Sequence, residues 1–206
     1  MRDQELDLEW RKALYAPLTM TTLILGVAIF IGAHLIPSVP SLRDRLQERV
    51  GRNAYRGLFA LVSLVGFVLL VVGMGRAPSV ALWDPPAWGH RVPVFAMPVA
   101  LILLVAAFMP TNLKRFTRHP MLWGVTIWAA AHLLANGDLA GLILFGSFGA
   151  FSLFDMWSAN QRGAQLSSKV VPYWRDLLVV LIGGIVYVGI LHSHGLLFGV
   201  PVVLGA

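Results

Sequence analysis

The stretch RHPMLWGVTIWAAAHLLANGD, residues 118–138, predicts one apolar helix with a histidine near each end and a tight polar turn behind it. The two histidines are His119 and His132, and the turn is Asn136-Gly137-Asp138. Ionisable side chains are costly in hydrocarbon and are usually kept there for a partner, a ligand or a proton path. The stretch therefore predicts a membrane helix that carries part of a functional site.

The apolar character of this stretch extends over most of the chain. Of its 206 residues, 57% are hydrophobic and only 13% are charged, and the mean hydropathy is +0.73. An ordinary soluble domain is less apolar than this. Nearly uncharged runs that suit spans of about 20 residues, once their flanks are included, occupy residues 19–36, 57–74, 92–109, 121–135, 139–154 and 177–200. The sequence thus predicts an all-α integral membrane protein, a bundle of about six transmembrane helices.

The fourth run, 121–135, is the weakest of the six. Its 15 residues rise about 1.5 Å each and reach about 22 Å, which is short of a hydrocarbon core of about 30 Å. It needs its polar flanks to span the membrane. Because only Asn136-Gly137-Asp138 separates it from the fifth run, helices 4 and 5 are expected to form a tight hairpin.

The basic residues indicate how the chain is oriented. Eleven of the 16 Lys and Arg residues lie in the alternate flanks 37–56, 110–120 and 158–175. The positive-inside rule then places the Arg-rich loop 37–56 in the cytoplasm and both termini outside, in a bacterial inner membrane. Basic loops beside anionic lipids account for the formal charge of +6, so membrane lipids are expected partners and nucleic acid is not.

The first 18 residues differ in kind from the rest. They mix acidic and basic side chains and contain neither an apolar core nor a small-residue cleavage site, so they do not resemble a signal peptide. Residues 1–18 are interpreted as a polar N-terminal extension that precedes a transmembrane domain of residues 19–206.

Residue types restrict the chemistry. The chain has no cysteine, which excludes disulfides, thiolate metal sites, iron–sulfur clusters and thiol nucleophiles. Three acids in the second half, Asp138, Asp155 and Asp176, fall near predicted helix ends. No catalytic residue is therefore assigned.

Histidines remain as the candidate ligands. His34 follows Gly32-Ala33 inside an apolar helix, and His132 follows three alanines, one turn after Trp128. Imidazole is a common ligand of iron, copper and zinc, and paired imidazoles in a helical bundle suit haem. The structural alternative is a histidine bonded to a backbone carbonyl of a neighbouring helix, with small residues serving helix packing.

Depth along the helices leaves the pairing open. If helix 1 runs inward and helix 4 runs outward, His34 and His132 differ in depth by about 12 Å. Depth alone pairs His34 with His119 on the inner side and His132 with His192 on the outer side. All four histidines, with Trp128, therefore stay candidates for a cofactor site.

Several spaced motifs agree with one known family. In chain order they are Gly-x-His with Pro37 and an Arg-rich loop, NAYRGLF at 53–59, LWDPP at 82–86, RHP at 118–120, and the segment from Ala131-His132 to Asn136-Gly137-Asp138. This sequence resembles the NnrU family over roughly residues 20–206. That family is linked by name to nitrite and nitric oxide reduction, and it is similar to the membrane zeta-carotene isomerases, which hold a b-type haem through two histidines.

The resemblance implies specific ligands. Matched motif by motif, the two haem ligands fall on His34 and His132. One position departs from the isomerase pattern, which has a cysteine three residues before the second histidine, where this chain has Ala129. A thiol-dependent ligand exchange is therefore not available here, while two imidazoles remain.

Three functions follow as hypotheses. The first is a membrane protein that binds haem b and is linked to nitrite and nitric oxide metabolism (denitrification), with a nitrogen-oxide reductase or a redox protein as partner. The second is a haem-dependent isomerase of a lipophilic polyene such as a cis-carotene. The third is a membrane methyltransferase, because Arg118-His119-Pro120 with Gly124 resembles part of that family's cofactor motif. Whether the protein is an enzyme, and its oligomeric state, stay open.

Overall fold

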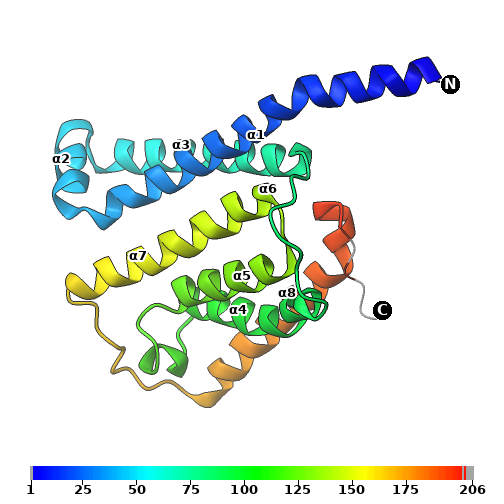
Figure 1. Cartoon of the computed structure of the whole chain (residues 1–206). Coiled ribbons are helices and arrows are strands. Elements are labelled where there is room, and N and C mark those ends of the chain that lie inside the picture. Colours follow the sequence, from blue (N-terminus) through cyan, green and yellow to red (C-terminus); the bar gives the residue numbers. More distant parts are fainter. Residues whose placement is uncertain (1, 201, 203–206) are drawn as a thin grey trace. The chain divides into compact units, whose positions relative to one another are not determined.

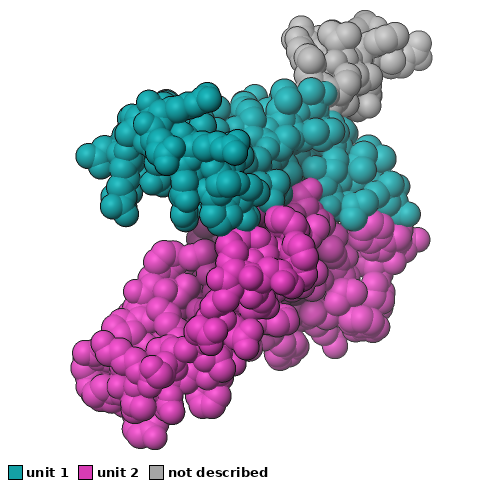
Figure 2. Space-filling model, turned by 90° about the vertical axis from the view of Figure 1, so that its left-hand side faces the viewer, with its two compact units in different colours: residues 1–82, 138–144 teal, residues 83–137, 145–206 magenta. Residues whose placement is uncertain are grey.

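The chain folds as helices joined by turns and loops (Figure 1). A computed structural model describes the backbone of residues 2–200 and 202, and the side chains of residues 19–200 and 202. Within that part of the chain the only β-type pairing is an isolated bridge between Ala81 and Asp138. The predicted all-α class is confirmed. The chain divides into two compact units, residues 1–82 with 138–144, and residues 83–137 with 145–206 (Figure 2).

Several helices have the length and composition of membrane spans. Among the described residues five such segments occur, at Thr19–Ser38, Arg52–Arg76, Gly89–Phe108, Leu139–Gln161 and Tyr173–Phe198. The expected fourth helix is present as Pro120–Ala135, and as predicted it is shorter than these. The chain is thus a multi-pass membrane protein by its helices, while the count of six spans and the tight hairpin stay predictions.

The first unit is built on two long helices that approach closely. They are α1 (Arg2–Ser38) and α3 (Arg52–Arg76), and they pack along one another. A Cβ at Gly26 or Gly73 would collide with the backbone of Leu70 or Leu23 on the other helix. Small residues allow this kind of contact in membranes, where packing must replace the hydrophobic effect between helices.

The rest of the first unit consists of short elements. The helix α2 (Pro40–Val50) has no buried residue and carries most of the predicted Arg-rich loop. Gly51, at φ +84°, then turns the chain into α3, a conformation that glycine adopts without strain. A single turn, α6 (Leu139–Gly141), also belongs to this unit. Asp138 caps its N-terminus, and the Asp138 carboxylate accepts a bond from Gly141 N at 2.6 Å.

The N-terminal residues extend the first helix. The backbone of residues 2–18 continues α1 rather than forming a separate element. The side chains of this stretch and residue 1 lie outside the described part, so the interpretation of residues 1–18 as a polar extension stays a prediction.

In the described part of the second unit there are four longer helices and two short turns. The helix α4 packs against both α5 and α8, and α5 packs against α7. In chain order the elements are η1 (Gly89–Arg91), α4 (Val92–Phe108), η2 (Asn112–Arg115), α5 (Pro120–Ala135), α7 (Ser147–Gln161) and α8 (Tyr173–Phe198).

Glycines and small polar residues bring these helices together. A Cβ at Gly124 of α5 would lie 2.8 Å from the carbonyl oxygen of Ala100 on α4. Thr126 of α5 and Ser152 of α7 share a hydrogen bond of 2.8 Å between their hydroxyls. Just before α7 the chain makes a π-helical turn, η3 (Leu142–Gly146). Such turns insert an extra residue into a helix and often occur at functional sites.

A polar anchor holds the segment between α4 and α5 to the start of α8. The carboxylate of Asp176 accepts bonds from the Thr111 hydroxyl at 2.5 Å, from Asn112 N at 2.8 Å and from Asn112 Nδ2 at 2.6 Å. The side chain of Asn112 also bonds both backbone groups of Val171. Because charge-assisted bonds are stronger than neutral ones, this network fixes that end of the second unit.

Candidate functional site

His34 lies near the end of α1, in the first unit, and its ring is held on several sides. Its Nδ1 is 2.7 Å from the carbonyl oxygen of Phe30, one turn earlier. The imidazole also stacks on the Phe30 ring, with centroids 4.2 Å apart, and contacts Phe59 of α3 at 5.2 Å. The side chain is half-buried. Its own helix therefore sets the ring's orientation, and α3 covers part of it.

The ring that contacts His34 from α3, Phe59, also contacts Tyr55, whose hydroxyl has no hydrogen-bond partner among the described residues. The ring of Tyr55 stacks on that of Phe59, with centroids 6.4 Å apart. The Tyr55 hydroxyl is buried and makes no hydrogen bond within the described part of the chain, and the same holds for Ser63 Oγ further along α3. Buried polar atoms in native structures are normally bonded, so such an atom calls for an explanation.

His132 lies near the end of α5, in the second unit, and repeats the arrangement of His34. Its Nδ1 is 2.8 Å from the carbonyl oxygen of Trp128, one turn earlier. The imidazole stacks on Phe145 at 4.8 Å, with an angle of 27° between the ring planes, and Trp128 contacts it at 5.7 Å. Phe145 belongs to the π-helical turn. That turn therefore supplies the ring that covers His132.

The two hydrogen bonds fix which ring nitrogen carries the proton. A carbonyl oxygen can only accept, so Nδ1 of both His34 and His132 must carry the proton and donate it. In the neutral ring the lone pair is then on Nε2. Histidines that bind metals usually donate their second N–H in this way, which orients the ring and raises the basicity of the ligating nitrogen.

The backbone bond alone does not identify a site. His192 on α8 makes the same bond, from Nδ1 to the carbonyl of Val188 at 2.8 Å, yet its side chain is exposed. His34 and His132 differ from His192 because each of their imidazoles contacts two aromatic rings. Among the described residues no hydrogen bond or ring contact joins His132 to His192.

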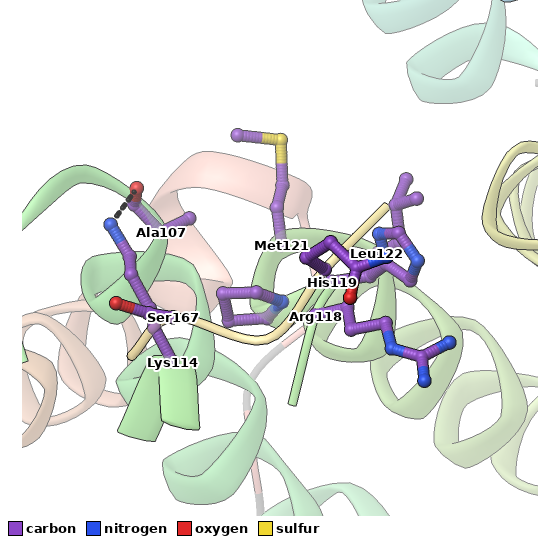
Figure 3. Close-up of a pocket in the computed structure, with 9 residues that line it drawn as sticks. Ala107, Lys114, Arg118, His119, Met121, Leu122 and Ser167 are labelled. Carbon is purple, nitrogen blue, oxygen red and sulfur yellow. Dashed lines mark hydrogen bonds between the residues drawn. The ribbon is translucent and has the colours of Figure 1, made fainter. Parts of the chain in front are cut away.

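His119 has a different environment at the start of α5. Its Nε2 lies 3.0 Å from Asn160 Oδ1 on α7, and Arg118 Nη1 lies 3.2 Å from the same oxygen. His119 thus holds its proton on Nε2, the reverse of His34 and His132. It lines a pocket with Lys114, and Figure 3 shows that pocket.

The candidate residues divide between the two units. His34 belongs to the first, while His119, Trp128, His132 and His192 belong to the second. The rings of Trp128 and His132 are in contact. Two of the predicted pairs, His34 with His132 and His34 with His119, combine a residue of the first unit with a residue of the second. Both pairs stay predictions.

Protein side chains alone provide no metal cluster in the described residues. No group of three or more His, Cys, Asp or Glu side chains there could hold a metal ion. This finding concerns sites built wholly from protein ligands, such as zinc sites. A haem needs only axial ligands from the protein, and an oriented imidazole with its Nε2 lone pair fits that requirement.

The sequence did not reveal the neighbours of these histidines. Phe145 and Phe59 come from other segments of the chain, and a single sequence carries no signal that pairs them with His132 and His34. Asn160 was missed for the same reason. The aromatic residue four positions before each histidine was visible, and this spacing is the signal that could have found part of both environments.

Comparison with known proteins gives the chain's relatives. The family described as NnrU protein matches residues 22–202. Two curated relatives are named 15-cis-zeta-carotene isomerase, chloroplastic. The protein from Zea mays is 28% identical over 160 residues, 68% of this chain, and that from Arabidopsis thaliana is 28% identical over 157 residues, 66% of this chain. Each alignment covers 43% of the relative's own length. No solved structure matches the chain.

Proposed function

The chain belongs to the NnrU family, and we propose that it is a membrane protein that binds haem b through His34 and His132 and acts, like its relatives, on a lipophilic polyene. The observation that carries this proposal is the repeated arrangement of the two histidines. Each donates Nδ1–H to the carbonyl one turn earlier and packs flat against an aromatic ring. Both imidazoles are thereby prepared to offer Nε2 to a metal.

The residues around each histidine have separate tasks in this proposal. Phe30 and Trp128 provide the accepting carbonyls that fix the tautomers, and Phe59 and Phe145 restrict the rings. A bound haem would supply an iron centre whose redox state and ligation can change. The Tyr55 hydroxyl, buried beside Phe59 without a described partner, is available to a polar group that binds near His34.

A second candidate function follows from Ala129. This residue is 1% exposed, and the chain has no cysteine at all. A stable pair of imidazole ligands with no thiol to exchange would favour electron transfer over polyene chemistry. In this case the protein serves nitrite and nitric oxide metabolism, with a nitrogen-oxide reductase or a redox protein as its partner.

The location proposed for the protein is the bacterial inner membrane, with the Arg-rich loop 37–56 in the cytoplasm. The exposed arginines of α2 support this orientation. The chain lacks cysteine, so no native thiol reacts with a labelling reagent. A single cysteine placed at Gln47 or at Trp88 would therefore report on which side of the membrane that position lies. Labelling of intact cells by a membrane-impermeant thiol reagent should reach position 88 and not position 47, and the reverse pattern contradicts the orientation.

Optical spectra of the purified protein test haem binding. Protein from haem-supplied cells should show a Soret band that shifts when dithionite is added. The band should be lost in the double variant His34→Ala, His132→Ala and kept in His90→Ala, which removes an exposed loop histidine. A spectrum unchanged in the double variant rejects the ligand assignment, and loss of the band in His192→Ala favours the alternative pair.

Two further assays separate the candidate functions. Cells that make a cis-polyene and carry this chain should convert it if the protein is an isomerase, and His132→Ala should abolish the conversion. The second function is favoured instead if haem-replete membranes do not convert the polyene and nitric oxide shifts the Soret band.

A further inference from the structure

A pocket separate from His34 and His132 opens in the second unit, where α4 ends and α5 begins (Figure 3). Its volume is about 430 Å³, within the range of small-molecule sites. In Figure 3, Lys114 lies at one end with Ala107 and Ser167, Arg118 and His119 lie at the other, and Met121 stands between them. The pocket therefore has basic groups at both ends and an apolar centre.

No acidic residue lines this pocket. The carboxylates near it in the sequence are engaged elsewhere: Asp155 pairs with Arg162 at 3.6 Å, and Asp176 accepts its three bonds from Thr111 and Asn112. The positive charges of Lys114 and Arg118 are thus not neutralised by an acid among the described residues.

Neutral acceptors hold these basic groups in place. Asn160 Oδ1 accepts from both Arg118 and His119, and the carbonyl of Ala107 accepts from Lys114 Nζ at 2.9 Å. An ammonium group has three N–H donors and a guanidinium has five, so each retains donors for a ligand. The pocket combines fixed positions with uncompensated charge, which suits an anion.

The start of α5 adds to the positive potential. Pro120 is the first residue of the helix and lines the pocket with Met121 and Leu122. The N-terminus of a helix carries a partial positive charge and unpaired N–H groups, and both favour phosphate.

The neighbouring surface places this pocket at a membrane boundary. Phe108, at the end of the apolar helix α4, is 77% exposed, and Phe116, beside η2, is 80% exposed. Exposed apolar rings next to basic residues suit a surface that contacts hydrocarbon on one side and lipid headgroups on the other. A ligand there can place its charge among the basic groups and its chains along Met121.

We propose that this pocket binds the phosphate group of an anionic membrane lipid. Free phosphate has the same charge, but it would leave the apolar centre and the exposed aromatic rings without a role. The lack of an acid also disfavours the sulfonium cofactor of a membrane methyltransferase, the function suggested by Arg118-His119-Pro120.

Native mass spectrometry of the purified full-length chain can test the site. The probes are dioleoyl phosphatidic acid, dioleoyl phosphatidylcholine as the zwitterionic comparison, and inorganic phosphate. The variant Lys114→Gln, Arg118→Gln should bind phosphatidic acid about 30-fold more weakly, since each basic group near the surface contributes about fivefold. The control Arg115→Gln, Lys169→Gln removes the same charge from exposed side chains that do not line the pocket and should change binding by about twofold, because solvent and salt screen exposed charges that do not contact the ligand.

Asn160→Asp provides a second variant that preserves the fold. It keeps an oxygen acceptor for Arg118 and His119 while adding a negative charge, so lipid affinity should fall by about fivefold or more. Its thermal unfolding should match that of the parent protein.

Three results would overturn the proposal. The first is equal binding of phosphatidic acid and phosphatidylcholine. The second is an equal loss in the pocket variant and its control, which would mean that general surface charge attracts the lipid. The third is inorganic phosphate binding as tightly as phosphatidic acid, which would identify free phosphate as the ligand.

Discussion

His34 and His132 stand on helices of different units, yet both follow an aromatic residue by four positions and an alanine by one. In both cases Nδ1 bonds the carbonyl of that aromatic residue, Phe30 or Trp128. The helices that carry them are held differently. Between α1 and α3, glycines of each helix lie directly against the backbone of the other. Between α5 and α7, two hydroxyl groups share a hydrogen bond. The local sequence thus sets how each imidazole is oriented, and helix packing sets which ring covers it.

The largest effect is expected where glycine allows backbone contact in the first unit. Gly73→Leu forces a side chain into the backbone of Leu23 and should destabilise the protein by about 3 kcal/mol, at the upper end of the usual cost of overpacking. Thermal unfolding in detergent measures this. Gly75→Leu, on the same helix with no atom within 4 Å of the added Cβ, should have little effect. Equal losses in both variants would mean that the α1–α3 contact does not limit stability.

A smaller loss is expected at the polar anchor of the second unit. Asp176→Ala removes the acceptor of the Thr111 hydroxyl, of Asn112 N and of one N–H of the Asn112 side chain, which should cost about 2 kcal/mol. The matched control is Asp84→Ala, which removes an exposed loop carboxylate. If both variants unfold at the same temperature, the anchor contributes no more than a surface charge.

The aromatic covers of the two histidines give a direct comparison of the units. Phe59→Leu and Phe145→Leu should each cost about 1 kcal/mol, because each removes a ring contact with an imidazole. Each should also broaden the Soret band of haem-loaded protein as the ring loses its restraint. A change confined to Phe145→Leu would show that only His132 depends on its aromatic cover.

The smallest effect is expected at the hydroxyl pair between α5 and α7. A double-mutant cycle of Thr126→Val and Ser152→Ala should give a coupling of about 0.6 kcal/mol, the usual size for such bonds in membranes. If the stability losses of the two single variants simply add, so that the coupling is zero, this hydrogen bond does not fix α5 against α7.

The sequence predicted the helical class because composition and charge placement are properties of single segments. It also singled out His34 and His132 as candidate ligands, since an ionisable residue inside an apolar run is visible without any contact information, and that assignment stays a prediction. It could not predict that the π-helical turn brings Phe145 to His132, or that Asn160 binds Arg118 and His119. Those features depend on how segments distant in the chain pack, and no local pattern encodes them. The close approach at Gly26 and Gly73 was likewise not predicted, because a glycine in an apolar run is compatible with either exposure or contact.

Electron paramagnetic resonance of the ferric, haem-loaded protein tests the central claim most directly. If the Nε2 atoms of His34 and His132 bind one iron, the parent protein should give the low-spin signal of two imidazole ligands. Removing either histidine should convert that signal to high spin, while His90→Ala should leave it unchanged. A low-spin signal that persists in both His34→Ala and His132→Ala, or protein that takes up no haem, would contradict the account.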